Sequence, residues 1–230
     1  MKNSERILVV LFWTFLVIDC IFMTKGLNDY RIYTKTLLVP ILLIGIYTTS
    51  QETKHSKSKV ITTLAFFFCF LGDFFLLGDA DKSYFIFGLS SFLLAHLFFI
   101  VFFLRLKKIS NKYRLFLSGI SALVFGYMGA LLFLIWKDVT LQNLQVPVVV
   151  YAAILGVMLT AAIHTINNKS IKRLSRYFFI PGAILFVLSD SILALNKFAP
   201  IFIYGNIIVM VTYAGALFLL YLGVVRYLKK

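Results

Sequence analysis

Two aspartates stand inside long apolar stretches of the sequence. Asp73 lies near the end of ITTLAFFFCFLGDFFLL, and Asp190 lies within GAILFVLSDSILALNKF. An ionised carboxylate at the centre of a membrane helix costs about 2.5–3.5 kcal/mol, so such residues are candidates for function by default. Burial favours the protonated form of a carboxyl group, and two neighbouring carboxyl groups ionise at different pH. The pair therefore predicts general acid–base chemistry.

Other polar side chains fall within the apolar stretches and could bind a substrate or orient a carboxyl group: Lys35, His96, Tyr151 and Tyr213. Their positions along the expected helices, like those of Asp73 and Asp190, gather in one half of the membrane. This concentration predicts a cavity. Two structural alternatives stay open, namely hydrogen bonds between helices without catalysis, and a Lys35 side chain that extends to the membrane interface.

The composition indicates that membrane helices position these side chains. The chain is 61% hydrophobic and 14% charged, with a mean hydropathy of +0.93, whereas soluble domains contain about 25% charged residues. A bilayer core of about 30 Å takes about 20 apolar residues per helix. The sequence contains eight such runs, at residues 7–24, 34–50, 60–78, 84–104, 113–136, 145–166, 177–196 and 200–225.

These runs are continuously apolar and do not alternate as the strands of a membrane β-barrel do. We therefore expect an all-α fold, a polytopic bundle of eight transmembrane helices that forms a single integral-membrane domain over residues 1–230. In a bacterium this would be a multi-pass protein of the cell membrane. The run at 113–136 carries Ser118, Ala122, Gly126 and Ala130 at four-residue spacing, which we interpret as a helix-packing face.

The basic residues predict how the bundle is oriented. Of the 23 Lys and Arg residues, 17 fall in the N-terminus, in the loops after the second, fourth and sixth runs, and in the C-terminus. By the positive-inside rule, this asymmetry places both termini in the cytoplasm. The net charge of +14 is thus explained by topology, and we expect contacts with anionic lipid and none with nucleic acid.

The N-terminal segment is basic and then apolar, like a secretory signal. It contains no small-x-small cleavage site, and Asp19 stands before Cys20, where a lipoprotein signal needs a small residue. We therefore expect a first helix that is retained in the mature protein.

Five segments resemble the YhhN/TMEM86 family of multi-pass membrane proteins: TKTLLVP (34–40), LGDFFLL (71–77), FGLSSFLLAH (87–96), YAAILGVM (151–158) and GAILFVLSDSILALNKF (182–198). The characterised animal members of this family are lysoplasmalogenases. The resemblance implies hydrolysis of the vinyl ether bond of a lysoplasmalogen to a fatty aldehyde and glycerophosphoethanolamine or glycerophosphocholine. The family's paired aspartates fall on Asp73 and Asp190, and Asn196 also matches a polar position of the motifs.

Vinyl ether hydrolysis suits two carboxyl groups, because its oxocarbenium intermediate resembles the glycosidase transition state. On this hypothesis Asp73 and Asp190 are the acid and the base in undetermined order, Lys35 faces the lipid phosphate, and His96 or Tyr151 orients a carboxyl group or the water. We expect no cofactor, and a lysophospholipid together with membrane lipids as partners. The oligomeric state stays open.

Other functions use the same residue types. An intramembrane aspartyl protease also places two aspartates on two helices, although Phe70 stands where its GxGD motif needs glycine. A small proton-coupled transporter could use the same carboxylates. A zinc-dependent membrane hydrolase needs several converging histidines, and only His55, His96 and His164 are present, so we expect no metal site.

Overall fold

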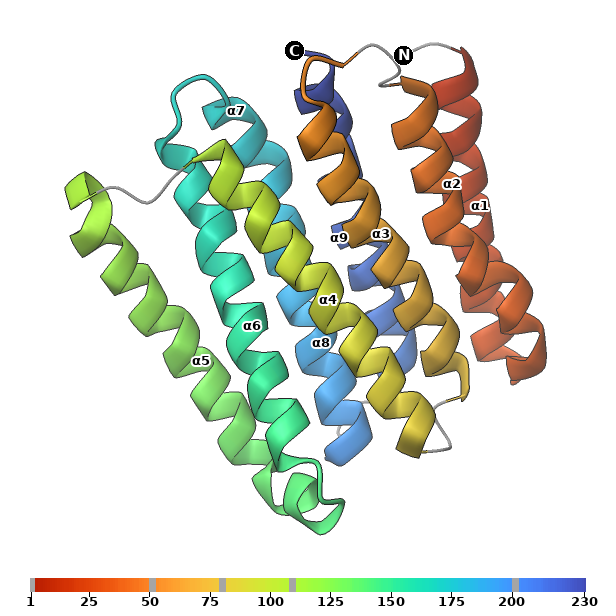
Figure 1. Cartoon of the computed structure of the whole chain (residues 1–230). Coiled ribbons are helices and arrows are strands. Elements are labelled where there is room, and N and C mark those ends of the chain that lie inside the picture. Colours follow the sequence, from red (N-terminus) through yellow and green to blue (C-terminus); the bar gives the residue numbers. More distant parts are fainter. Residues whose placement is uncertain (1–2, 50–52, 79–81, 108–110, 200–202) are drawn as a thin grey trace.

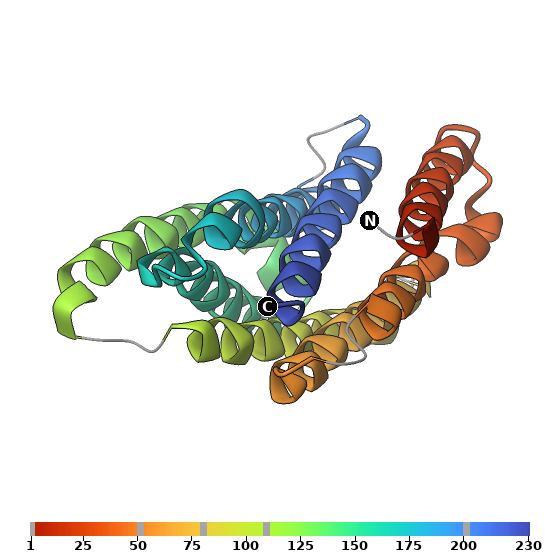
Figure 2. The same cartoon turned by 90° about the horizontal axis from the view of Figure 1, so that it is seen from above.

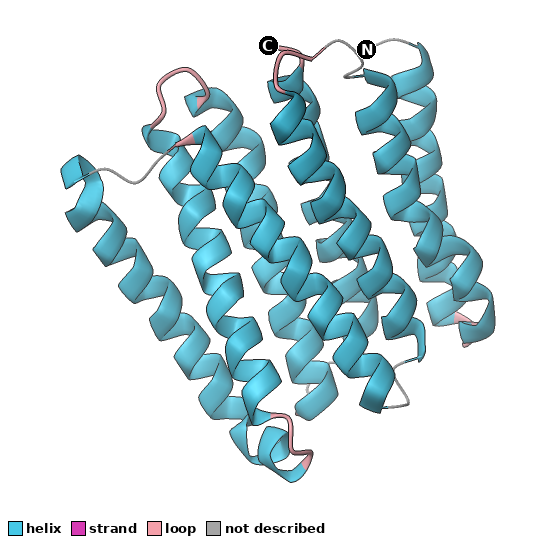
Figure 3. Cartoon of the chain, in the orientation of Figure 1, coloured by secondary structure: helices cyan, strands magenta, loops and turns pink. Residues whose placement is uncertain are grey.

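The computed structural model describes the chain except for residues 1–2, 50–52, 79–81, 108–110 and 200–202 (Figure 1). Eight helices in the described part are long and apolar enough to cross a membrane. Their bounds are α1 Asn3–Thr24, α2 Ile32–Thr49, α3 Ser56–Phe75, α4 Lys82–Leu106, α5 Arg114–Leu141, α6 Gln145–His164, α8 Ile180–Phe198 and α9 Gly205–Leu228. The described residues contain no strand (Figure 3). The prediction of an all-α integral-membrane bundle is confirmed.

Short helical turns join several of these helices. They are η1 Asn28–Arg31 before α2, η2 Leu76–Gly78 after α3, η3 Asn111–Tyr113 before α5, η4 Thr165–Asn167 after α6, and α7 Lys172–Leu174 followed by η5 Ser175–Phe179. The η5 segment is a turn of π-helix and leads directly into α8.

Six helices form a closed ring, in which each packs against the next in the order α2, α3, α4, α6, α8, α9 and back to α2 (Figure 2). The helix α1 lies outside the ring against α2 and α9, and α5 lies outside it against α6 and α8. The start of α1 and the end of α9 lie at the same end of the bundle, where Lys229 Nζ is 2.6 Å from Glu5 Oε1 (Figure 1). The side of the membrane that this end faces stays a prediction.

Small residues let neighbouring ring helices approach closely, as expected where lipid provides no hydrophobic drive between helices. A Cβ atom on Gly72 of α3 would lie 2.6 Å from the ring of Phe92 on α4, and one on Gly182 of α8 would lie 3.0 Å from Leu220 on α9. The small residues of α5 do not behave in this way. These residues, Ser118, Ala122, Gly126 and Ala130, are exposed. The prediction that they form a helix-packing face is therefore wrong for contacts within this chain.

Aromatic side chains fill the interior of the ring in the half that is nearer the termini. Phe66, Phe99, Phe103 and Phe179 are buried there, with ring centroids 5.7 Å apart for Phe66 and Phe99 and for Phe103 and Phe179. The polar side chains of the ring interior must therefore gather in the opposite half.

Candidate functional site

Each of the six ring helices contributes one of the polar residues that the sequence singled out. They are Lys35 on α2, Asp73 on α3, His96 on α4, Tyr151 on α6, Asp190 on α8 and Tyr213 on α9. Four of them, Lys35, Asp73, Asp190 and Tyr213, line one cavity of about 280 Å³ in the half of the ring remote from the termini. His96 and Tyr151 do not line the cavity but contact the Asp190 carboxyl group. The ring order thus brings together residues that are far apart in the sequence.

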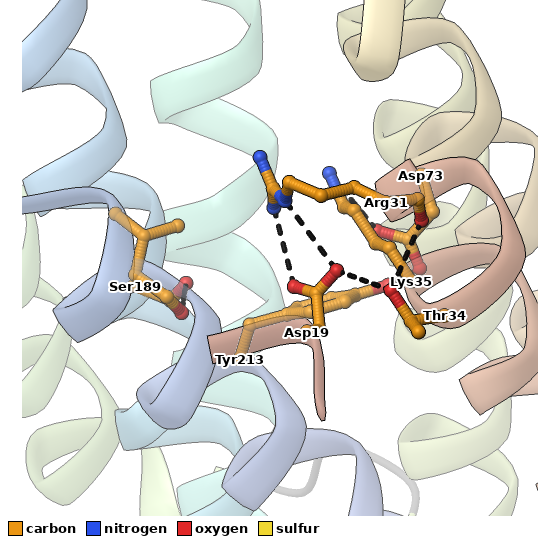
Figure 4. Close-up of polar contacts among 8 residues, drawn as sticks. Asp19, Arg31, Thr34, Lys35, Asp73, Ser189 and Tyr213 are labelled. Carbon is orange, nitrogen blue, oxygen red and sulfur yellow. Dashed lines mark hydrogen bonds and ion pairs between the residues drawn. The ribbon is translucent and has the colours of Figure 1, made fainter. Parts of the chain in front are cut away.

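Asp73 is buried near the end of α3 and contacts side chains from α2 and α9 (Figure 4). The Tyr213 hydroxyl donates a hydrogen bond of 2.8 Å to Asp73 Oδ2. The Lys35 ammonium lies 3.7 Å from Oδ1. Both oxygens of this carboxyl group therefore have a partner, and one partner is a cation.

Asp190 has different surroundings. The Tyr151 hydroxyl donates a hydrogen bond of 2.6 Å to Asp190 Oδ2, and His96 Nε2 lies 3.3 Å from the same oxygen. His96 is fully buried, and its Nδ1 has no hydrogen-bond partner among the described residues. The neutral tautomer with hydrogen on Nε2 leaves no buried donor unpaired, so we assign that tautomer. In the described part of the chain, no donor bonds the other Asp190 oxygen, Oδ1, which is left for the cavity.

The two carboxyl groups thus share one cavity but have separate partners. A pair of titratable groups in unlike environments is the arrangement by which enzymes obtain an acid and a base from the same residue type. The cavity wall between them also has apolar side chains, including Leu76, Phe92 and Met210. The site can accommodate a molecule with a hydrocarbon part close to two carboxyl groups.

Asn196 lies apart from these residues, farther along α8. It does not line the cavity, and its side-chain amide packs against Gly205 at the start of α9. Its Nδ2 and Oδ1 atoms are buried and form no hydrogen bond with the described residues. The structure therefore does not place Asn196 with the other candidates.

The sequence interpretation missed another buried carboxylate, which is held by an arginine and a threonine. Asp19 of α1 is fully buried. Its Oδ1 accepts a hydrogen bond of 2.7 Å from Thr34 Oγ1, while Arg31 Nε and Nη2 lie 3.4 and 3.3 Å from Oδ1 and Oδ2 (Figure 4). Arg31 in turn lines the cavity that holds Asp73 and Asp190. The sequence could have identified Asp19, because it is an ionisable residue inside an apolar run and thus meets the criterion that identified Asp73.

Among the described residues, no group of three or more His, Cys, Asp or Glu side chains is placed to hold a metal ion. Two of the three histidines also have partners elsewhere in the bundle, His55 stacking on Tyr227 and His164 meeting Tyr113 edge-on.

Several known proteins resemble this chain in sequence. Two curated relatives named lysoplasmalogenase, from Mycobacterium bovis and Mycobacterium tuberculosis, are each 33% identical to this chain over 122 residues. Each alignment covers 53% of this chain and 42% of the relative, so the chain matches less than half the length of these relatives. No solved structure matches the chain significantly. The YhhN family matches residues 30–224, which is most of the sequence and confirms the resemblance, and the chain therefore belongs to the YhhN family.

Proposed function

We propose that this protein is a membrane hydrolase that cleaves the vinyl ether bond of lysoplasmalogens. The observation that carries the proposal is that Asp73 and Asp190, from opposite parts of the ring, line one cavity in a member of the YhhN family. The products would be a fatty aldehyde and glycerophosphoethanolamine or glycerophosphocholine. The names of the two mycobacterial relatives support the same activity.

The reaction requires one proton donor and one proton acceptor. A protonated carboxyl group transfers its proton to the vinyl carbon remote from oxygen, which leaves an oxocarbenium ion. Water adds to the cation carbon as the second carboxylate takes a proton from the water, and the resulting hemiacetal collapses to aldehyde and alcohol. One water molecule is consumed, and the two carboxyl groups end with one proton between them, as they began. A neighbouring carboxylate also stabilises the positive charge of the intermediate.

The other residues of the site have supporting roles in this proposal. Tyr213 and Lys35 fix the position of Asp73, whereas Tyr151 and His96 fix that of Asp190. The side chains of Leu76, Phe92 and Met210 accommodate the start of the hydrocarbon chain. Because both carboxyl groups lie within the ring interior, we expect the alkenyl bond to enter the bundle and the rest of the chain to stay near lipid.

The test is aldehyde release from lysoplasmenyl-ethanolamine by the purified protein in detergent. We expect Asp73→Asn and Asp190→Asn each to abolish most of the release, because either change removes the acid or the base. Asp138→Asn is the matched control, since Asp138 lies near the end of α5 outside the site. Full activity of both site variants would refute the assignment of the pair. Binding of the lipid without turnover by the wild type would instead favour a transporter.

A further inference from the structure

We propose that Arg31 binds the phosphate of the lysophospholipid substrate and that a second hollow beside Arg31 holds the headgroup. The inference deepens the function proposed above and rests on it. It follows from the position of Arg31 between two hollows and from the way Asp19 holds its guanidinium group.

Two hollows meet at Arg31. The first is the cavity that contains Asp73 and Asp190. The second has a volume of about 450 Å³ and lies beside the end of α1 and the start of α9, with Thr24, Tyr204 and Ile207 in its wall. Asn28, Arg31 and Asn206 line both of them. A single molecule that extends from the aspartates past Arg31 would therefore occupy both hollows.

Arg31 keeps hydrogen-bonding capacity for an anion although it is paired with Asp19. Only Nε and Nη2 are engaged by the Asp19 carboxylate, and the third guanidinium nitrogen points away from it (Figure 4). An arginine carries five N–H donors in a planar fork that matches the geometry of a phosphate group. Because the side chain is only 16% exposed and Asp19 is itself held by Thr34, little rotamer freedom remains to be lost when an anion binds.

The charges around the second hollow favour an anion at this point. Arg31 is the only charged side chain among the described residues that line it, and the amides of Asn28 and Asn206 are further donors beside it. Lys35 lies one helical turn deeper, where its ammonium faces Asp73. The cation that is available at the junction of the two hollows is therefore Arg31.

The covalent structure of the substrate fits this arrangement. Only the three-carbon glycerol separates the vinyl ether oxygen of a lysoplasmalogen from its phosphate ester. A phosphate at Arg31 therefore keeps the alkenyl bond within the adjoining cavity, beside Asp73 and Asp190. The ethanolamine or choline group then extends into the second hollow.

The experiment compares kcat/KM for lysoplasmenyl-ethanolamine with kcat/KM for the corresponding 1-alkenylglycerol, which has no phosphate. We expect the wild type to prefer the phospholipid and Arg31→Gln to lower the ratio of the two values at least about tenfold, as expected for loss of hydrogen bonds to a charged group. Arg31→Lys should restore part of the ratio. Arg176→Gln, which changes an exposed arginine at the opposite end of the bundle, should leave the ratio unchanged.

A double variant addresses loss of folding. Arg31→Gln alone leaves the Asp19 carboxylate without its cation, so Asp19→Asn with Arg31→Gln removes both charges, and it should show the same fall in the ratio. Equal wild-type kcat/KM values for the two substrates, or parallel losses on both substrates in the Arg31 variants, would overturn this inference and leave the proposed hydrolase intact. No aldehyde from either substrate with folded wild-type protein would overturn both.

Discussion

Tyr151 of α6 donates a hydrogen bond of 2.6 Å to Asp190 of α8, and this contact joins two helices that are adjacent in the ring. The Asp190 oxygen that accepts it also lies 3.3 Å from His96 Nε2. Asp190 Oδ2 is thus held by two side chains. No donor among the described residues bonds Oδ1, which is available to a molecule in the cavity. The orientation of the Asp190 carboxyl group depends on this pair.

We expect Tyr151→Phe to lower kcat for aldehyde release by about 10- to 100-fold with little change in KM, because a hydrogen bond to a charged group contributes about 1.5–3 kcal/mol. Tyr127→Phe is the matched control, since the Tyr127 hydroxyl donates a comparable hydrogen bond of 2.8 Å to Ser191 on the same helix α8. Equal effects of the two substitutions would contradict a specific role for Tyr151.

The role of Lys35 can be separated from that of Arg31. If Lys35 acts on Asp73, from which it lies 3.7 Å, Lys35→Met should reduce cleavage of lysoplasmenyl-ethanolamine and of 1-alkenylglycerol by similar factors. The control is Lys82→Met, because Lys82 binds the Gln142 carbonyl oxygen outside the site. A selective loss on the phospholipid would instead support the sequence-based prediction that Lys35 faces the phosphate.

The Asp19–Arg31 pair should matter for stability as well as for binding. Asp19→Ala leaves the Arg31 guanidinium without its carboxylate, while Thr34 keeps only a longer hydrogen bond of 3.3 Å to the Arg31 carbonyl oxygen. Breaking a buried ion pair by removing one partner costs about 3–5 kcal/mol. We therefore expect a clearly lower Tm of the purified protein in detergent. The pair is mostly buried, so the loss should persist in high salt. A Tm equal to that of the wild type would show that the pair contributes little to the fold.

The contact between α3 and α4 should not tolerate a methyl group at Gly72. A Cβ atom there would lie 2.6 Å from the Phe92 ring, which lines the cavity, and overpacking of this kind costs about 1–3 kcal/mol. We expect Gly72→Ala to lower both Tm and aldehyde release. Gly126→Ala on α5 meets no described atom within 4 Å, so it should leave both unchanged. Similar effects of the two substitutions would contradict the helix packing described above.

The orientation of the bundle can be tested independently of activity. The distribution of basic residues predicts that both termini are cytoplasmic. A reporter that is active only in the cytoplasm should therefore be active when fused after Lys230 and inactive when inserted into the turn at Asn143, at the opposite end of α5 from Arg114. The reverse pattern would show that the whole bundle is inverted.

Composition and hydropathy were sufficient to establish the fold class and the number of membrane helices. A bilayer core admits only backbones whose hydrogen bonds are satisfied within the protein, so eight apolar runs of sufficient length mean eight helices. The sequence also identified Asp73 and Asp190 as candidates for function, because placing an ionisable side chain within the membrane costs free energy and such residues are rare there.

Which side chains meet was decided by the tertiary structure alone. The helices are apolar around most of their circumference, so hydropathy does not show which face of α5 meets lipid or that Asn196 lies outside the cavity that Asp190 lines. Only the order of helices around the ring places Asp73 and Asp190 at one cavity, with Arg31 at its junction with a second hollow. The physical reason is that helix order and rotation depend on packing between surfaces distant in the sequence, where small residues such as Gly72 allow close approach.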